Sequence, residues 1–230
     1  WSKSRSVESD NVIVFWDKVY GTKKPSESPS AYKVTEQDLL QKCEAFYELE
    51  INQLGFADPV NSNLSKYKIM VLLSHTTDWV CYGCGYDYQI SALWLGPSAC
   101  KPVGHSVAHE VGHSFQYMCF SEHGGDIDSQ TDNTGFHMPC GNGQTIWEQT
   151  AQWMAFQMCP EETFINYNFA EFCDNAHRHF AHEDMRYGSY FFHYYWVDKY
   201  GLDAVSKVWH TARRPKDSLE SYMSAFSLTL

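Results

Sequence analysis

The most specific pattern in the chain is the stretch Ser106-Val-Ala-His109-Glu110-Val-Gly-His113-Ser-Phe-Gln-Tyr117. It lies in a segment, residues 103–120, whose apolar residues recur at helical spacing. Residues four apart share one face of a helix, so His109 and His113 can present two imidazoles to one metal ion. Glu110 is rotated by about a third of a turn from His109, where it can reach a metal-bound water without binding the metal itself. The stretch therefore predicts a helix that carries two zinc ligands and a general base.

Two neighbours of these residues need a separate interpretation. His105 lies four residues before His109, but this pairing would put Ser106 where the base belongs. We therefore interpret His105 as a residue at the start of the helix, beside the ligands. Gly112 disfavours a helix by about 1 kcal/mol relative to alanine, which indicates that another backbone packs closely against it.

The third protein ligand decides the class of zinc site, because a catalytic site keeps its fourth position open for water. A metzincin would carry glycine at position 116 and histidine or aspartate at 119, where this chain has Gln116 and Cys119. Our choice is Glu148, near the start of an expected amphipathic helix over residues 145–158. The alternative is a helix cap, because Thr145-x-x-Glu148 also matches a capping box.

The polar stretch between the two helices, residues 121–144, reads as a long loop, and long loops inside compact domains are often functional. It contains further residues that could supply the third ligand: His123, Asp126, Asp128, Asp132 and His137.

The rest of the chain indicates an α+β fold in one domain. Strands are expected over residues 11–16, 67–73 and 90–95, and a helix should begin after Thr35 and end near Gly55. Further helices are expected near residues 169–180, 186–200 and 202–212. Strands come early and helices late, so we expect an α/β subdomain over about residues 1–120 and a helical subdomain over about residues 121–230.

Composition excludes several classes of protein. The chain has 230 residues, of which 43% are hydrophobic and 20% charged, which is typical of a folded domain. Its net charge of −11 does not suit a nucleic-acid-binding protein, which needs a dense basic face. No apolar run approaches the roughly 18–20 residues that span a bilayer. The chain begins at Trp1 and not at methionine, so we expect a mature or trimmed form.

The eight cysteines and the 16% of aromatic residues are typical of an exported protein, in which several cysteines should be paired as disulfides. One closely spaced pair, Cys81-Tyr-Gly-Cys84, could be a redox pair, half of a zinc knuckle or a local disulfide. No second such pair completes a four-cysteine zinc site, and no thioredoxin-like pattern surrounds this one.

Three segments together resemble the gluzincins, which are zinc metallopeptidases with two ligand histidines and a glutamate on a following helix. These segments are His109-Glu110-Val-Gly-His113, Trp147-Glu148-x-x-Ala151, and residues 187–201, which begin Tyr187-Gly188-Ser-Tyr190. The chain is most similar to uncharacterised secreted bacterial gluzincin-like proteins, whose amino-terminal strand resembles residues 12–16 and whose pre-helix strand resembles residues 92–97. It departs from thermolysin-like members in its longer ligand spacing and in Gln152, where they carry an aspartate. A glutamine at this position can still accept a hydrogen bond from a ligand histidine, although it is less basic than an aspartate.

The resemblance implies a zincin-like fold, with a twisted amino-terminal sheet and an active-site helix before a mostly helical part. It implies Zn2+ held by His109, His113 and Glu148, with Glu110 as general base in peptide-bond hydrolysis. Tyr187 or Tyr190 would stabilise the oxyanion, with His193 a further candidate in the same segment; the alternative is that this aromatic stripe only packs.

For the surroundings of the site, the resemblance implies that residues 90–95 form the sheet edge to which a peptide adds. The implied substrates are peptides, proteins or glycoproteins, and the implied location is secreted, periplasmic or cell-surface, in a bacterium.

Two other functions fit the same motif. One is a non-catalytic zinc-bearing module of zincin fold that binds protein or glycan, since aromatic-rich surfaces stack on sugars and peptides. The intact Glu110 argues against it, because a structural site has no use for a base there. The other is a zinc hydrolase that acts on another amide or on a glycopeptide, which the sequence does not separate from a peptidase.

Overall fold

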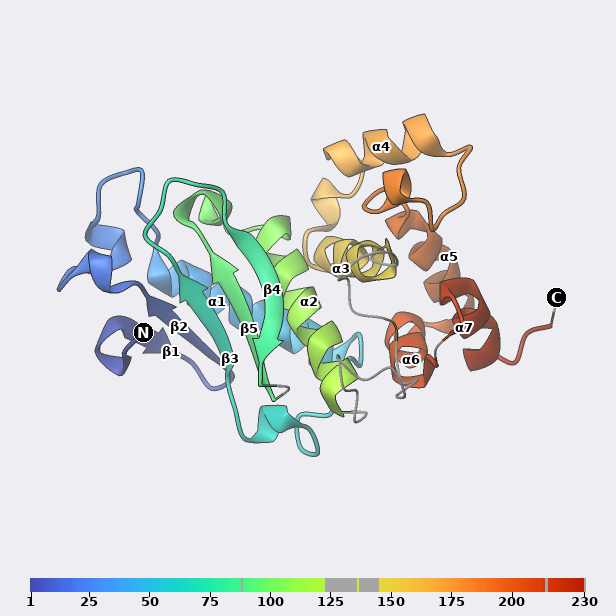
Figure 1. Cartoon of the computed structure of the whole chain (residues 1–230), viewed down its shortest axis with the longest axis horizontal. Helices are drawn as coiled ribbons and strands as arrows, with labels where there is room; N and C mark the ends of the chain where they lie inside the picture. The colour runs from blue at the N-terminus through green and yellow to red at the C-terminus, as the bar shows by residue number, and fades with distance from the viewer. Residues whose placement is uncertain (88, 123–135, 137–144, 214, 230) are drawn as a thin grey trace.

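The computed structural model describes residues 1–87, 89–122, 136, 145–213 and 215–229. An amino-terminal mixed sheet precedes a mostly helical carboxy-terminal part, which confirms the predicted α+β class (Figure 1). The described residues form five strands of one sheet, in the order β1-β2-β3-β5-β4. Their bounds are β1 Ser6–Glu8, β2 Val12–Trp16, β3 Ile69–Leu73, β4 Cys81–Tyr86 and β5 Ile90–Leu95.

The helices follow the predicted pattern, with shifts at their ends. They are α1 Glu36–Asn52, α2 His105–Glu122, α3 Thr145–Met158, α4 Tyr167–Asn175, α5 Tyr190–Tyr200, α6 Ala204–Thr211 and α7 Ser218–Ala225. Helix α7 was not expected from the sequence. No described helix has the length and apolar character needed to cross a bilayer.

The edge of the sheet differs from the prediction. Strands β2, β3 and β5 are parallel neighbours, and β4 pairs antiparallel with β5 on its other side. Strand β5 is therefore an inner strand, and among the described strands β4 forms the edge, so the expectation that residues 90–95 form the edge was wrong. The physical reason is burial: Ala92, Leu93 and Leu95 are completely buried, as in a strand covered on both sides.

Two glycines bring the edge strand close to helix α2. A Cβ atom at Gly83 would lie 2.1 Å from the backbone oxygen of Glu110, and one at Gly85 would lie 2.0 Å from the ring of Tyr117. Only glycine allows this approach of strand to helix. The same glycines weaken the strand signal of residues 81–86, which is why β4 was not expected.

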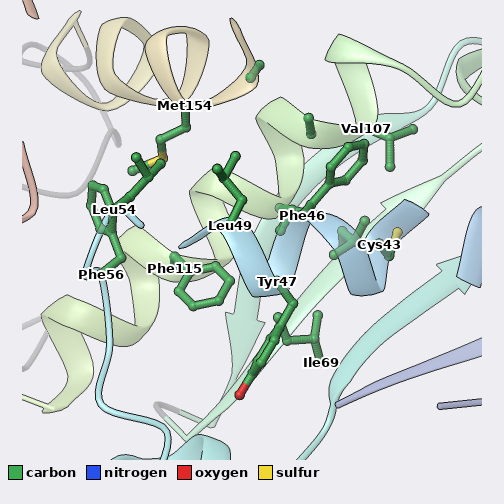
Figure 2. Packing of buried hydrophobic residues seen from close by; sticks show 14 of the residues in the cluster. Cys43, Phe46, Tyr47, Leu49, Leu54, Phe56, Ile69, Val107, Phe115 and Met154 are labelled. Atoms are coloured by element: carbon green, nitrogen blue, oxygen red, sulfur yellow. The ribbon is translucent and has the colours of Figure 1, made fainter. Parts of the chain in front are cut away.

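The main core lies between the sheet and the helices that cover it. Phe46 and Leu49 of α1 pack near Val107 and Phe115 of α2, as Figure 2 shows. Met154 extends from α3 toward the same core.

Helix α3 also lies directly against Gly112 of α2. A Cβ at Gly112 would lie 2.7 Å from the sulfur of Met154 and 3.4 Å from the Cα of Ala151. The predicted close approach at Gly112 is thus confirmed, and the partner is the helix that carries Glu148.

The structure corrects the expectation of disulfides for the cysteines that it describes. No two of these seven cysteines are joined. Residues three apart in a strand point to opposite faces, so Cys81 and Cys84 of β4 are not placed to pair with each other. The thiol of Cys81 points to the carbonyl of Ser106 in α2, at 3.7 Å. Cys140 lies outside the described residues.

A buried carboxyl on α1 yields a stability prediction. Glu50 is 2% exposed, its Oε2 has no hydrogen-bond partner among the described residues, and burial raises its pKa to about 8. The unfolded chain ionises this group near pH 4.5, so folding stability is highest below that pH and falls as the pH rises to about 8. Glu50→Gln should therefore raise both the melting temperature and the free energy of unfolding. The gain in free energy should grow from pH 5 to pH 8 and reach on the order of 1–3 kcal/mol.

Thermal denaturation at several pH values tests this prediction. Glu48→Gln, on the exposed face of the same helix, is the matched control and should change the melting temperature little at any pH. A gain for Glu50→Gln that is equal at pH 5 and pH 8 would contradict the assigned pKa.

Candidate metal centre

Helices α2 and α3 bring three metal-binding side chains to one point. Oε2 of Glu148 lies 3.1 Å from Nε2 of His109 and 3.3 Å from Nε2 of His113. A tetrahedral zinc ion with bonds of about 2.0–2.2 Å would hold its ligand atoms about 3.3 Å apart. The spacing of these atoms thus fits a zinc ion, and the set of two imidazoles and one carboxylate suits that metal.

A glutamine fixes the orientation of each histidine. Nδ1 of His109 lies 2.9 Å from Oε1 of Gln152, and Nδ1 of His113 lies 2.8 Å from Oε1 of Gln116. An amide oxygen only accepts hydrogen bonds, so each Nδ1 carries a proton, and in the neutral imidazole each Nε2 then has a lone pair. Both lone pairs are then available to a metal beside Glu148, as ligand histidines require.

The glutamine on the His113 side belongs to a buried network. Nε2 of Gln116 donates to the carbonyl of Trp147 and to the hydroxyl of Thr150, at 2.9 and 2.7 Å. The hydroxyl of Thr150 also accepts a hydrogen bond from the indole of Trp209 in α6. This network joins α2 to α3 and so fixes the position of His113 relative to Glu148. From the sequence, Gln116 served only to exclude a metzincin, and its contact with His113 was not predicted.

The charges at the site favour a cation. Burial opposes ionisation of Glu148, but the hydrogen bonds and charges of His109 and His113 outweigh it and hold the pKa of this carboxyl well below its usual range. Burial also lowers the pKa of His113, but Glu148 and Glu110 outweigh it and raise that pKa. A proton on His113 and a metal ion would occupy the same position, so metal binding should release protons.

The carboxylate of Glu148 is used by the histidines and not by its own helix. Among the described residues, this carboxylate is hydrogen-bonded to His109 and forms ion pairs with His109 and His113. Thr145 is the first residue of α3. The capping alternative is therefore not the arrangement that these described residues adopt.

Two cavities lie beside the cluster of His109, His113 and Glu148. The first, here called the Gln152 pocket, is lined by Trp79, Cys81, His105, Ser106, His109, Glu110, Gln152, Tyr167 and Tyr187. The second runs beside the edge strand and is lined by Cys81, Tyr82, Gly83, Cys84, His109, Glu110, His113, Trp147, Glu148 and Tyr187. Glu110 and Tyr187 line both cavities, so each side chain lies where the two cavities approach His109.

Comparison with known proteins gives a family. Residues 1–229 match the model of a family of unknown function, DUF6055. The chain belongs to the DUF6055 family. No curated protein and no solved structure matches it.

The aromatic candidates of the DUF6055 chain separate into two groups. Tyr187 precedes α5, lines both cavities and has its ring centre 6.0 Å from that of His109. Tyr190 is completely buried, and its hydroxyl donates a hydrogen bond to the carbonyl of Thr163. His193 is also completely buried and lies 2.8 Å from the hydroxyl of Tyr222. Neither Tyr190 nor His193 lines the cavities at the ligands.

The other candidates are placed as follows. His105 is the first residue of α2, lines the Gln152 pocket and contacts the carboxylate of Glu162. Two aromatic residues at the site, Trp79 and Tyr167, were not expected from the sequence. The loop candidates His123, Asp126, Asp128, Asp132 and His137 lie outside the described residues.

Proposed function

We propose that this chain is a zinc-dependent peptidase of gluzincin type, with a zincin-like fold. The observation that carries the proposal is the convergence of His109, His113 and Glu148 at zinc-like spacing, beside a glutamate that lines both cavities. Bound zinc would supply a polarised water and a Lewis acid for the scissile carbonyl. The secreted, periplasmic or cell-surface location stays a prediction.

Glu110 is the general base in this proposal. It is the residue after His109 on α2, it lines both cavities beside the three metal-binding side chains, and its charge helps to raise the pKa of His113. There it accepts a proton from the attacking water and then delivers it to the leaving amine. Its side chain is 8% exposed overall, which keeps bulk water from competing for that proton.

Tyr187 is the residue that we assign to the oxyanion. Burial, followed by the charge of Glu148, raises the pKa of Tyr187 to about 12, so its hydroxyl keeps its proton at neutral pH. A protonated phenol that lines these two cavities can donate a hydrogen bond to the oxygen that becomes negative in the transition state. Tyr190 is not retained in this role, because its hydroxyl is used by Thr163.

The edge strand β4 would bind the substrate backbone. It pairs with β5 on one side, and its residues Tyr82, Gly83 and Cys84 line the cavity next to the ligands. An extended peptide can add to such an edge through main-chain hydrogen bonds, which give binding with little sequence preference. This supports peptides and proteins, glycoproteins included, as the substrate class.

Zinc analysis and a casein digest test the proposal. Purified protein should hold about one zinc, and His109→Ala/His113→Ala should remove it, because these residues supply two of the three ligands. Casein hydrolysis should stop with a chelator and return when zinc is added. Undiminished zinc in the double variant would contradict the metal site, and hydrolysis that resists the chelator would contradict the mechanism.

A further inference from the structure

The two glutamines that orient the ligand histidines differ in one respect. The amide nitrogen of Gln116 makes two hydrogen bonds, to Trp147 and Thr150. The amide nitrogen of Gln152 is buried and has no hydrogen-bond partner in the part of the chain that the structure describes. A buried donor without a partner is destabilising, and folded proteins keep few of them. A ligand that supplied a hydrogen-bond acceptor to the amide nitrogen of Gln152 would therefore be stabilised.

The orientation of this amide is fixed by the site. A histidine that binds metal through Nε2 carries its proton on Nδ1, so the group facing His109 must be the acceptor oxygen of Gln152. That contact is the observed 2.9 Å pair. Rotating the amide would place two donors against each other, so the nitrogen cannot satisfy itself by exchanging places with the oxygen.

The surroundings of Gln152 indicate what the partner is. Gln152 is 3% exposed and lines the pocket that carries its name, beside His109 and Glu110. Two exposed aromatic side chains, Trp79 and Tyr167, form part of the same lining. No lysine or arginine is among the described residues that line it, and Glu110 contributes a carboxylate, so the pocket suits an uncharged acceptor next to a flat apolar group.

We propose that Gln152 binds substrate: its Nε2 donates a hydrogen bond to an uncharged amide carbonyl oxygen while its Oε1 orients His109. The inference rests on the proposed peptidase function. In it, the substrate residues next to the scissile bond bind in the Gln152 pocket. The carbonyl is that of a peptide bond or of an asparagine or glutamine side chain. One glutamine then couples ligand orientation to substrate position.

Gln152→Glu separates these two roles. The glutamate keeps an acceptor for Nδ1 of His109 but replaces the amide donor by a carboxylate oxygen, which repels a carbonyl. Zinc affinity, measured by chelator competition, should stay within about threefold of the parent. Affinity for fluorescein-labelled casein should fall at least tenfold, as for one lost hydrogen bond and added repulsion. Fluorescence anisotropy of the zinc-loaded protein in a Glu110→Gln background measures this affinity without cleavage.

Two further variants complete the experiment. Gln157→Glu adds the same charge to α3 outside the pocket and should leave both affinities unchanged. Gln152→Ala removes both roles and should weaken zinc about 10–100-fold, as for other partners of ligand histidines. Casein deamidated at its glutamine and asparagine side chains identifies the carbonyl. The loss of affinity caused by Gln152→Glu persists if a peptide bond supplies the carbonyl and shrinks if a side chain does.

The outcomes separate this inference from the proposed function. Cleavage of casein by the parent protein, together with unchanged casein affinity in Gln152→Glu, would overturn the role of Gln152 alone. A loss of zinc in Gln152→Glu as large as that in Gln152→Ala would also overturn it, because the glutamate would then fail to separate the two roles. A zinc-loaded parent that neither binds nor cleaves casein would overturn both.

Discussion

Glu110→Gln should abolish casein hydrolysis while zinc content and melting temperature stay close to those of the parent. The substitution keeps the size of the side chain and removes only the carboxylate that accepts the proton of the attacking water. Loss of a positioned acid–base group typically lowers the rate by about 10²–10⁴-fold. Initial rates of hydrolysis, zinc analysis and thermal denaturation on the same preparation measure the three quantities together.

The matched control for this variant is Glu161→Gln. Glu161 is exposed in the turn after α3 and lines neither cavity, so its variant should hydrolyse casein at the parental rate. A Glu110→Gln protein that keeps zinc and retains most of its activity would remove Glu110 from the mechanism. A variant that loses its zinc would instead show that Glu110 supports the metal site.

The fold could be predicted wherever the sequence periodicity was strong. The helical spacing around His109 and the apolar runs of β3 and β5 gave the right elements, with ends shifted by a few residues. Strand β4 was missed because Gly83 and Gly85 remove the usual strand signal, although these glycines are what bring the strand against α2. Its position at the edge of the sheet depends on pairing between distant segments, which local patterns do not encode.

The residues of the candidate site could be predicted where they lie on one helix or belong to a recognisable sequence motif. The helix alone sets the spacing of His109 and His113, and Glu148 followed from a resemblance and from its place on the next helix. Trp79 and Tyr167 lie at a loop and at a helix start, where no periodicity marks them. Which of the 15 tyrosines faces the ligands depends on tertiary packing, so the sequence did not separate Tyr187 from Tyr190.

The histidine partners were partly foreseeable. Gln152, four residues after Glu148, was recognised as a possible acceptor for a ligand histidine, and the structure pairs it with His109. Gln116 is three residues after His113 on the same helix, close enough to reach back to its ring. The helical spacing was therefore enough to predict the contact between Gln116 and His113. It was not predicted, because position 116 was considered only as evidence against a metzincin.

Glu148→Ala should remove most of the bound zinc, because two histidines alone leave the metal under-coordinated. The loss of zinc affinity should exceed the roughly 10–100-fold change seen when only a partner of a ligand histidine is removed. Isothermal titration with zinc, with chelator competition for the parent protein, measures the difference. Glu148→Gln should also bind zinc more weakly, since it replaces the charged oxygen that contacts both histidines by a neutral one.

Thr145→Ala decides between a metal ligand and a helix cap. If Thr145 and Glu148 formed only a capping box, both alanine variants would lose about 0.5–2 kcal/mol of stability and neither would lose zinc. We expect zinc loss in Glu148→Ala alone, because its carboxylate contacts the imidazoles of α2. Full zinc content in Glu148→Ala would contradict the gluzincin assignment and move the search for the third ligand to His123, Asp126 and His137.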